Sequence, residues 1–413
     1  MSITAPPPCR SCGDEGLLPF LDLGSTPLSD ALVPPERADQ PDDEYPLEVT
    51  FCPTCAMVQI TETLPEDVLF PDDYPYFSSF SDQLLRHSRR HAEGLISSRG
   101  LHSSSLVMEL ASNDGYLLKN FVEAGVPVLG VDPAPAQVAQ ANRDGVRSRC
   151  AFFGRELATE LRDEFGPADV IIANNVMAHI PDLNGFVAGM AHMLADDGII
   201  TVENPWVHDL IEHGEFDTMY HEHIFYHSCI GVEALMNRHG LHLNHVEHFA
   251  DLHGGTLRYH ISHHERRSPE AKEFFATEYE AGLDTFAYYD GFAHRVEAIR
   301  DELVALLTRL RDEGATVAAY GAAAKGSTLL NYAGIDRSLV SFVVDRNTHK
   351  HGLHMPGTHQ PIFDPAVLLE QSPDYLLLLA WNFADEIMAQ QFEYAAAGGR
   401  FIRPIPTPEI IQP

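Results

Sequence analysis

Short apolar runs of strand character alternate with stretches of helical character in two parts of the chain, residues 81–262 and residues 314–413. Such alternation predicts parallel sheets with helices packed on their faces, the doubly wound α/β arrangement. The first part is therefore expected to form a nucleotide-binding type of domain, and the second a smaller unit of the same type. The strand-like runs of the first part lie at residues 105–110, 126–132, 168–176 and 196–206.

Two further patterns complete the organisation of the chain. The runs at 241–249 and 254–263 indicate an antiparallel pair of strands that finishes the first sheet. Residues 297–314 carry apolar side chains at helical spacing, which predicts a helix that joins two lobes and packs on both. The chain is thus expected to divide into four segments, 1–80, 81–262, 263–313 and 314–413.

Composition and charge narrow the class of protein. The chain has 413 residues, 45% of them hydrophobic, which is enough for several ordinary cores. Its formal net charge of −33 argues against a nucleic-acid partner, because phosphate backbones are bound by basic surfaces. No apolar run approaches the roughly 20 residues that span a bilayer, and residues 1–10 lack the pattern of a signal peptide. We expect a cytoplasmic protein with no membrane partner; the sequence does not indicate its oligomeric state.

Four of the six cysteines form two close pairs near the N-terminus, Cys9-x-x-Cys12 and Cys52-x-x-Cys55. In a cytoplasmic chain this spacing is typical of a metal site rather than of disulfides. Four thiolates close a tetrahedral zinc site and leave no position for water, so the predicted Zn²⁺ is structural. A redox pair or unliganded thiols are the alternative interpretation.

A tight turn follows the first predicted strand of the 81–262 segment, at Glu-Leu-Ala-Ser-Asn-Asp-Gly, residues 109–115. Such a turn exposes backbone N–H groups, and Asp132 at the end of the next strand is placed to accept hydrogen bonds from ribose hydroxyls. Because G-x-G-x-x-G and a pyrophosphate cradle are missing, S-adenosylmethionine fits better than a dinucleotide. Glu109 and Asp114 suit its cationic amino-acid end. The residues predicted to bind this cofactor are Glu109, Ala111, Asn113, Asp114, Gly115, Asp132, Pro133, Phe153, Asn174 and Asn175.

Some of these cofactor assignments have simpler alternatives. Asn174 and Asn175 end a predicted strand at the carboxyl edge, where ligands lie in such sheets, but asparagine also ends strands as a turn former. Phe153 could flank the adenine, and it could equally belong to a core.

Residues 219–228, Met-Tyr-His-Glu-His-Ile-Phe-Tyr-His-Ser, put three histidines, two tyrosines and one glutamate into ten positions. This density favours acid–base chemistry, because histidine titrates near neutrality. A metal site is an alternative, although His221 and His223 would face opposite sides of a strand. A purely structural polar loop is another alternative.

Together these features resemble the three-domain, zinc-containing, S-adenosylmethionine-dependent C-methyltransferases that act on nucleotide-linked deoxysugars, such as those that methylate C3 of a thymidine diphosphate 4-keto-6-deoxysugar. The resemblance covers nearly the whole chain. It is carried by the cysteine pairs and, in this order, by the motifs FLDLGSTPLSD, YPYFSS, ELASNDGYLL, MAHIPD, ENPW, YHEHIFY, HGGTLRY, YGAAAKG and LAWN.

The resemblance implies an α/β fold in which a class I methyltransferase domain, 81–262, lies between a zinc-binding module, 1–80, and further C-terminal segments. Those segments are a helical connector, 263–313, and a second Rossmann-like domain that binds substrate, 314–413. Two positions depart from the family pattern. His221 stands where the sugar enzymes carry an acidic residue, and Ala111 replaces a frequent glycine of the cofactor turn.

The resemblance also implies the catalytic residues. A sugar C–H becomes acidic only beside a carbonyl, so carbon methylation needs a base that removes this proton and groups that stabilise the enolate. We expect His223 to be the base, with His179 as the other candidate. Glu222 is expected to orient or activate an imidazole, and Tyr220 to donate a hydrogen bond to the enolate oxygen. The catalytic candidates are Tyr76, His179, Tyr220, Glu222 and His223.

The C-terminal segment carries the candidate substrate contacts. Residues 320–325, Tyr-Gly-Ala-Ala-Ala-Lys, follow a strand, and their small side chains allow a phosphate to approach a helix N-terminus beside Lys325. By family analogy this segment holds the nucleotide diphosphate of a nucleotide-sugar substrate; the alternative is that the turn only packs a helix on a strand. The predicted substrate-binding residues are Tyr74, Tyr76, Tyr320, Lys325 and Arg346.

Three other functions stay open on the sequence. One is a methyltransferase that acts on a non-sugar activated ketone or enol. Another is an NAD(P)-dependent oxidoreductase or epimerase that uses the C-terminal segment, although this segment lacks the full glycine pattern. The last is a non-catalytic, zinc-clipped binding module.

Overall fold

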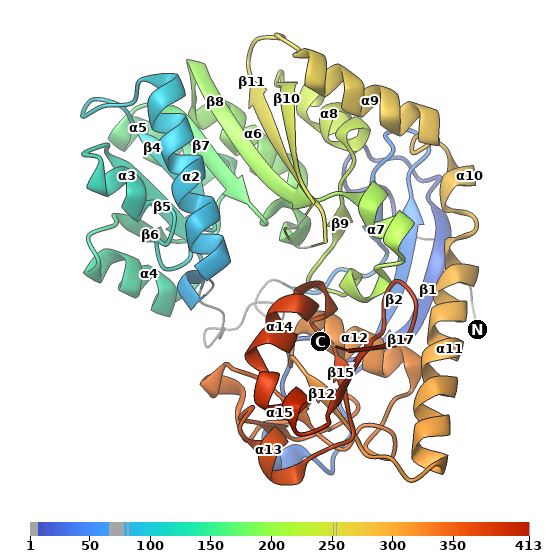
Figure 1. Cartoon of the computed structure of the whole chain (residues 1–413). Coiled ribbons are helices and arrows are strands. Elements are labelled where there is room, and N and C mark those ends of the chain that lie inside the picture. The colour runs from blue at the N-terminus through green and yellow to red at the C-terminus, as the bar shows by residue number, and fades with distance from the viewer. Residues whose placement is uncertain (1–6, 66–77, 81, 251, 253, 413) are drawn as a thin grey trace.

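The computed structural model describes residues 7–65, 78–80, 82–250, 252 and 254–412 (Figure 1). Three sheets organise the molecule: a four-stranded N-terminal sheet, a seven-stranded central sheet and a six-stranded C-terminal sheet. The predicted α/β fold class is confirmed. None of the helices in these ranges has the length and apolar character needed to cross a bilayer.

The central sheet has the strand order β10-β11-β8-β7-β4-β5-β6. The strands from β8 to β6 run parallel, while β11 and β10 are antiparallel at one edge, as the sequence predicts. The apolar runs of β4 and β7 are buried because helices cover both faces of a parallel sheet. The strands are β4 (Val107–Leu110), β5 (Val128–Asp132), β6 (Ser148–Cys150), β7 (Ala168–Asn174), β8 (Leu194–Pro205), β10 (His242–Phe249) and β11 (Thr256–Ser262), and the helices of this region are α2 (Asp82–Arg99), α3 (Lys119–Glu123), α4 (Pro135–Arg143), α5 (Arg155–Phe165), α6 (Leu183–Met193), α7 (Val207–His213) and α8 (Cys229–Arg238).

The segment after β4 continues the predicted turn at residues 109–115 beyond its expected end. The structure has turns up to residue 118 and only the short helix α3. Ala111, Asn113 and Gly115 all have positive φ, at 56°, 49° and 78°. Residues in the left-handed conformation interrupt a right-handed helix. Each non-glycine residue in this conformation costs about 1–2 kcal/mol, so the surrounding structure must stabilise the turn.

The N-terminal sheet contains one strand from far along the chain. Strands β1 (Leu18–Thr26), β2 (Tyr45–Phe51) and β3 (Val58–Ile60) form an antiparallel meander, and β9 (Phe225–Tyr226) pairs with β3 at its edge. The expected segment 1–80 therefore shares a sheet with residues of the expected segment 81–262. This pairing ties the histidine-rich stretch to the cysteine-bearing module.

The connector consists of three helices rather than one: α9 (Pro269–Ala281), α10 (Phe286–Tyr289) and α11 (Phe292–Asp312). Helix α11 packs on β1 of the N-terminal sheet and on β12 and α12 of the C-terminal unit, and Figure 1 shows it along one flank of the molecule. The expected packing of this helix on two lobes is thus seen, with the N-terminal sheet as one of them.

The C-terminal sheet has the order β14-β13-β12-β15-β16-β17 and is parallel except for β17. It follows the strand–turn–helix pattern predicted for 314–413. Its elements are β12 (Val317–Tyr320), α12 (Ala324–Ala333), β13 (Val343–Val344), β14 (Ile362–Phe363), α13 (Val367–Gln371), β15 (Tyr375–Leu378), α14 (Ala384–Gln390), α15 (Phe392–Ala396), β16 (Arg400–Arg403) and β17 (Glu409–Ile411).

Candidate functional site

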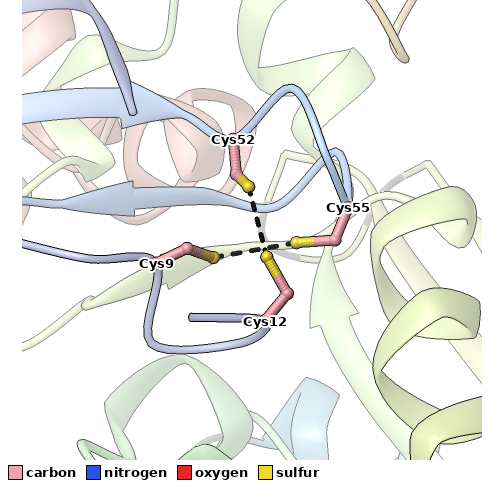
Figure 2. A group of neighbouring side chains, drawn as sticks. All are labelled: Cys9, Cys12, Cys52 and Cys55. Carbon is pink, nitrogen blue, oxygen red and sulfur yellow. Dashed lines mark hydrogen bonds between the residues drawn. The ribbon is translucent and has the colours of Figure 1, made fainter. Parts of the chain in front are cut away.

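The four paired cysteines converge on one point, as Figure 2 shows. Their sulfur atoms all lie within 4.8 Å of one another, with 3.7 Å between Cys9 and Cys55 and 3.5 Å between Cys12 and Cys52. A tetrahedral ion with Zn–S bonds of 2.3 Å requires sulfur separations of about 3.8 Å. The donor set and its spacing therefore fit a closed, structural zinc site, as predicted.

One cavity of about 1060 Å³ is lined by residues from the N-terminal module, from the domain of the central sheet and from the C-terminal unit. It runs from the turn after β4, past the histidine-rich stretch, to the first turn of α12 in the C-terminal unit. The sequence-predicted residues that line it are Ala111, Asn113, Asp132, Pro133, Phe153, Asn174, Asn175, His179, Tyr220, Glu222, His223, Tyr320, Lys325 and Arg346.

At the cofactor end, Asp132 holds the turn in shape. Its carboxylate accepts hydrogen bonds from the backbone N–H groups of Asn113, at 2.9 Å, and Ala134, at 2.8 Å. Burial raises the pKa of Asp132, and these two N–H groups oppose the shift. Phe153 packs edge-on against Phe186, so this ring combines a core contact with a place on the cavity wall.

Three predicted cofactor residues do not line the cavity: Glu109, Asp114 and Gly115. Glu109 is buried in β4, and burial, followed by the charges of Asp132 and Asp114, raises its pKa well above the usual range. A side chain on Gly115 would meet Val146 at 3.0 Å, and its φ is positive. Of these three residues, Gly115 shapes the turn, while Glu109 and Asp114 are buried beside it and each has one carboxylate oxygen without a hydrogen-bond partner among the described residues.

The strand β7 ends in two asparagines at the carboxyl edge of the sheet. The Oδ1 atom of Asn174 is buried and has no hydrogen-bond partner among the described residues, although the residue lines the cavity. Asn175 has a φ of 52°, and its backbone N–H donates to Glu203 O at 2.7 Å. An unpaired buried oxygen facing a cavity fits a ligand donor such as the ammonium group of S-adenosylmethionine.

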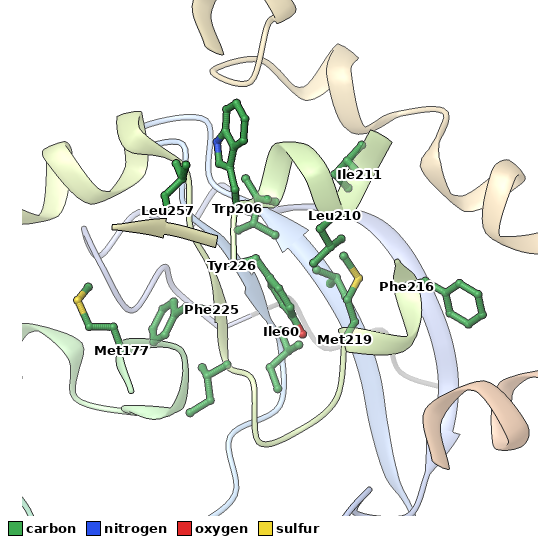
Figure 3. Close-up of a cluster of buried hydrophobic side chains, with 14 of the residues drawn as sticks. Ile60, Met177, Trp206, Leu210, Ile211, Phe216, Met219, Phe225, Tyr226 and Leu257 are labelled. Carbon is green, nitrogen blue, oxygen red and sulfur yellow. The ribbon is translucent and has the colours of Figure 1, made fainter. Parts of the chain in front are cut away.

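Most of the histidine-rich stretch is a loop rather than a strand, and its residues are buried or half-buried. Ile224 N–H donates to Ala178 O at 2.7 Å, and the next two residues form β9 on the N-terminal sheet. Beyond the loop, the Glu278 carboxylate of α9 accepts from Cys229 N, at 2.7 Å, and Ile230 N, at 2.9 Å. Figure 3 shows the buried apolar side chains that surround this region.

Tyr220 and His223 form a hydrogen-bonded pair within the loop. His223 Nδ1–H donates to Thr218 O at 2.9 Å, so its Nε2 carries the lone pair and accepts from the Tyr220 hydroxyl at 3.0 Å. His179 lies beside them, with 4.8 Å between the two imidazole centroids, and its Nδ1–H donates to Glu222 O at 2.5 Å. Burial lowers the pKa of His179 to about 4, which keeps that ring neutral at pH 7.

The side chain of Glu222 does not touch either imidazole in this arrangement. Its Oε1 accepts from the backbone N–H of Asp30 at 3.3 Å, and Thr218 takes the orienting role on His223 that the sequence assigns to Glu222. Burial, followed by the charge of Asp30, raises the pKa of Glu222 to about 8. At pH 7 Glu222 is therefore a neutral acid that can donate a hydrogen bond into the cavity.

This raised pKa predicts a pH-dependent stability. Between the ordinary pKa of 4.5 and about 8, folded Glu222 keeps a proton that the unfolded chain has released. Its stabilising contribution is thus complete below pH 4.5 and is lost as the pH rises through about 8. Glu222→Gln, which mimics the neutral acid, should be more stable than the wild type at pH 8.5 by about 1–3 kcal/mol, and this gain should shrink toward pH 5.

Melting temperatures of both proteins across this pH range measure the effect. Glu160→Gln, on the exposed face of α5, is the matched control and should show no pH-dependent difference. A gain from Glu222→Gln that is constant from pH 5 to pH 8.5 would mean that Glu222 ionises normally.

Three positively charged side chains line the C-terminal end of the cavity, together with the carboxyl groups of Asp345 and Glu386. Lys325 lies in the first turn of α12, where Nζ donates to Asn382 Oδ1 at 3.2 Å and lies 4.6 Å from the Trp381 ring centroid. Lys350 Nζ donates to Ala322 O at 2.6 Å. The exposed Arg346 lines the same end of the cavity, and its guanidinium lies 3.8 Å from Glu386 Oε1.

Several cavity residues were missed by sequence reasoning. Asp30 comes from the N-terminal module, and Asn204 ends β8; both belong to motifs quoted above, FLDLGSTPLSD and ENPW, without a role of their own. His227, which belongs to the histidine-rich stretch but was given no role of its own, is 1% exposed and lines the cavity. Tyr74 and Tyr76 lie outside the described residues.

Three family models match the chain in sequence order: a zinc-binding domain at 9–70, a methyltransferase domain at 84–246 and a C-methyltransferase C-terminal domain at 251–406. The chain is 36% identical over 407 residues to the C-methyltransferase NovU of Streptomyces niveus, which covers 98% of this chain and 96% of that protein. It is also 31% identical over 125 residues to the ubiquinone biosynthesis O-methyltransferase of Azorhizobium caulinodans, covering 29% of this chain and 47% of that protein.

Among solved structures, the magnesium protoporphyrin IX methyltransferase of Synechocystis with bound S-adenosylmethionine matches 45% of this chain and 79% of its own, at 13% identity and a TM-score of 0.34.

Proposed function

Because this chain belongs to the zinc-containing family of S-adenosylmethionine-dependent C-methyltransferases, we propose that it methylates a carbon next to the keto group of a nucleotide-linked deoxysugar. One observation carries the proposal. One cavity is lined by residues of the cofactor turn, by the acid–base loop and by three positively charged side chains of the C-terminal segment.

The cofactor lies at the end formed by β4, β5 and β7. Asn113 and Asp132 present polar groups for the ribose and adenosine side, and Asn174 presents its unpaired oxygen to the amino-acid end. S-adenosylmethionine, when bound, supplies an electrophilic methyl group on sulfur.

His223 acts as the base in this proposal. Its Nε2 takes the proton from the carbon beside the carbonyl, and Thr218 O stabilises the resulting imidazolium through Nδ1–H. The Tyr220 hydroxyl, released from Nε2, donates to the enolate oxygen, and neutral Glu222 is a second donor. The enolate carbon would take up the methyl group that S-adenosylmethionine supplies, and His223 returns its proton to solvent.

The positive end of the cavity binds the nucleotide diphosphate. Lys325, Arg346 and Lys350 supply charge, and the first turn of α12 supplies backbone N–H groups for phosphate oxygens. The segment 314–413 therefore holds the substrate while 81–262 holds the cofactor, and Tyr320 lines the wall between them.

The test is a panel of keto-deoxysugar nucleotides incubated with methyl-labelled S-adenosylmethionine. We expect at least one substrate to gain one methyl group by mass spectrometry. We also expect the carbon beside its carbonyl to take up deuterium from solvent when S-adenosylhomocysteine replaces the methyl donor. Transfer only to non-sugar ketones would replace the sugar in this proposal, and binding of NAD(P) without binding of S-adenosylmethionine would end it.

A further inference from the structure

Two residues that line the cavity, between the acid–base loop and the central sheet, have buried polar side-chain atoms without partners. Asn204 is 0% exposed, and neither Nδ2 nor Oδ1 has a hydrogen-bond partner among the described residues. His227 is 1% exposed, and its Nε2 is likewise unpaired there. Each buried polar group without a partner costs about 1–3 kcal/mol in stability. The occurrence of two such residues at the same place therefore calls for an explanation.

The backbone holds these two side chains close together. Asn204 is the second-last residue of β8, and Trp206 directly beyond β8 forms a bridge with His227. Val207 N–H then donates to His227 O at 3.0 Å. Both residues line the cavity, where the neighbouring wall residues Leu210 and Phe225 are apolar, so the two polar groups form an isolated polar spot.

The end of β8 is rigid because of the residue before Asn204. Glu203 lies on the opposite face of the strand and accepts from Arg258 Nε at 2.7 Å and His87 Nε2 at 3.0 Å. Although burial opposes ionisation, these partners lower the pKa of Glu203 to about 2. Because the Glu203 side chain is fixed on one face of β8, the Asn204 side chain on the other face is also held in place. A fixed side chain is suited to recognising a ligand group.

Asn204 and His227 lie at a different position along the central sheet from the residues proposed to bind the cofactor's ribose. Asp132 ends β5, and β8 lies three strands away in the order β8-β7-β4-β5, or about 14 Å at ordinary strand spacing. The spot also lies next to β9 and the Tyr220–His223 loop. A group bound at this spot would lie beside the acid–base loop, where the reacting carbon of the acceptor must also lie.

We propose that Asn204 and His227 form a specificity subsite that binds one ring hydroxyl of the acceptor sugar; this inference rests on the proposed function. A hydroxyl both donates and accepts, so it can donate to Asn204 Oδ1 and accept from Asn204 Nδ2 or His227. Burial lowers the pKa of His227 to about 3, so its ring stays neutral and does not attract a phosphate or carboxylate.

The test uses keto-sugar nucleotides that each lack one ring hydroxyl. Wild-type kcat/KM should fall about 10–100-fold for one member of this series, because its absence leaves the subsite unpaired. Asn204→Leu should lower kcat/KM for the fully hydroxylated sugar by a similar factor and remove its preference over that member. His227→Leu should act on the same hydroxyl, and the double variant should lose little more than the worse single variant.

Controls separate this subsite from the cofactor site and from folding. Asn204→Leu should keep the wild-type melting temperature and affinity for S-adenosylmethionine, whereas Asn174→Leu should weaken that affinity. If Asn204→Leu weakens cofactor binding instead, or leaves the hydroxyl preference unchanged while the wild type is active, the inference is wrong and the proposed function stands. If the wild type neither binds nor methylates any sugar of the series, both fall.

Discussion

His223→Ala is expected to slow methyl transfer by about 10²–10⁴-fold while leaving the affinity for S-adenosylmethionine unchanged. The imidazole is held by Thr218 and Tyr220, and it lies in the cavity beyond the cofactor turn, so its loss should remove the proposed base and leave the cofactor contacts in place. Single-turnover rates with labelled methyl donor measure the effect, and calorimetry measures cofactor binding. Deuterium uptake at the carbon beside the carbonyl should be lost in parallel.

His221 of the same loop is the matched control for this result. It is buried, does not line the cavity, and its Nε2 donates to Pro46 O at 3.1 Å. His221→Gln should therefore affect stability more than the chemical step. If His223→Ala turns over at the wild-type rate while His179→Ala does not, His179 is the base and the assignment of His223 is wrong.

Cys52→Ser is expected to remove the zinc and to lower both stability and activity by a large amount. Structural zinc sites of small modules contribute about 10–16 kcal/mol of apparent binding free energy, so the N-terminal sheet should not hold without the ion. Because β9 pairs with β3 of that sheet, the Tyr220–His223 loop would lose its anchor, and less than about a tenth of the activity should remain.

Elemental analysis, thermal melting and the methyl-transfer assay check this prediction together. Cys150→Ser is the control, because Cys150 is exposed on β6 and does not belong to the four-cysteine group. A Cys52→Ser protein with one zinc per chain would overturn the four-thiolate site. A Cys52→Ser protein without zinc but with full activity would show that methyl transfer does not depend on the zinc module.

The sequence predicts well those parts of the fold that follow patterns repeated along the chain. Alternating strands and helices of 81–262 and 314–413 bury continuous apolar runs, and such runs are visible in one dimension. The cysteine pairs are equally visible, because a C-x-x-C turn brings its two thiolates together wherever it lies. These signals are local, so they need no knowledge of which segments meet in space.

The features that were missed depend on contacts between distant residues. Strand β9 is two residues long, too short to show a period, and its partner β3 lies far back in the sequence. The hydrogen bond from Asp30 to Glu222 joins residues 192 positions apart and decides where that carboxyl points. Asn204 and His227 sit within apolar surroundings that gave their positions the look of ordinary core.

The turn after β4 was predicted, but its length was not, for another reason. Ala111 and Asn113 adopt left-handed conformations that helix propensity does not anticipate, so a helix-favouring sequence, Tyr-Leu-Leu-Lys, begins its helix late. Tertiary contacts to Asp132 stabilise that turn, and only the folded chain contains them.

The crossing of β9 into the N-terminal sheet sets the rule for recombining this enzyme with its relatives. A chimera with a crossover near residue 80 would take β1, β2 and β3 from one parent and β9 from the other. In such a chimera β9 would pair with a β3 strand beside which it did not evolve. Residues 219–228 should travel with residues 7–65 as a single non-contiguous block, and parents joined in this way are the ones in which new acceptor preferences can be sought without loss of the catalytic geometry.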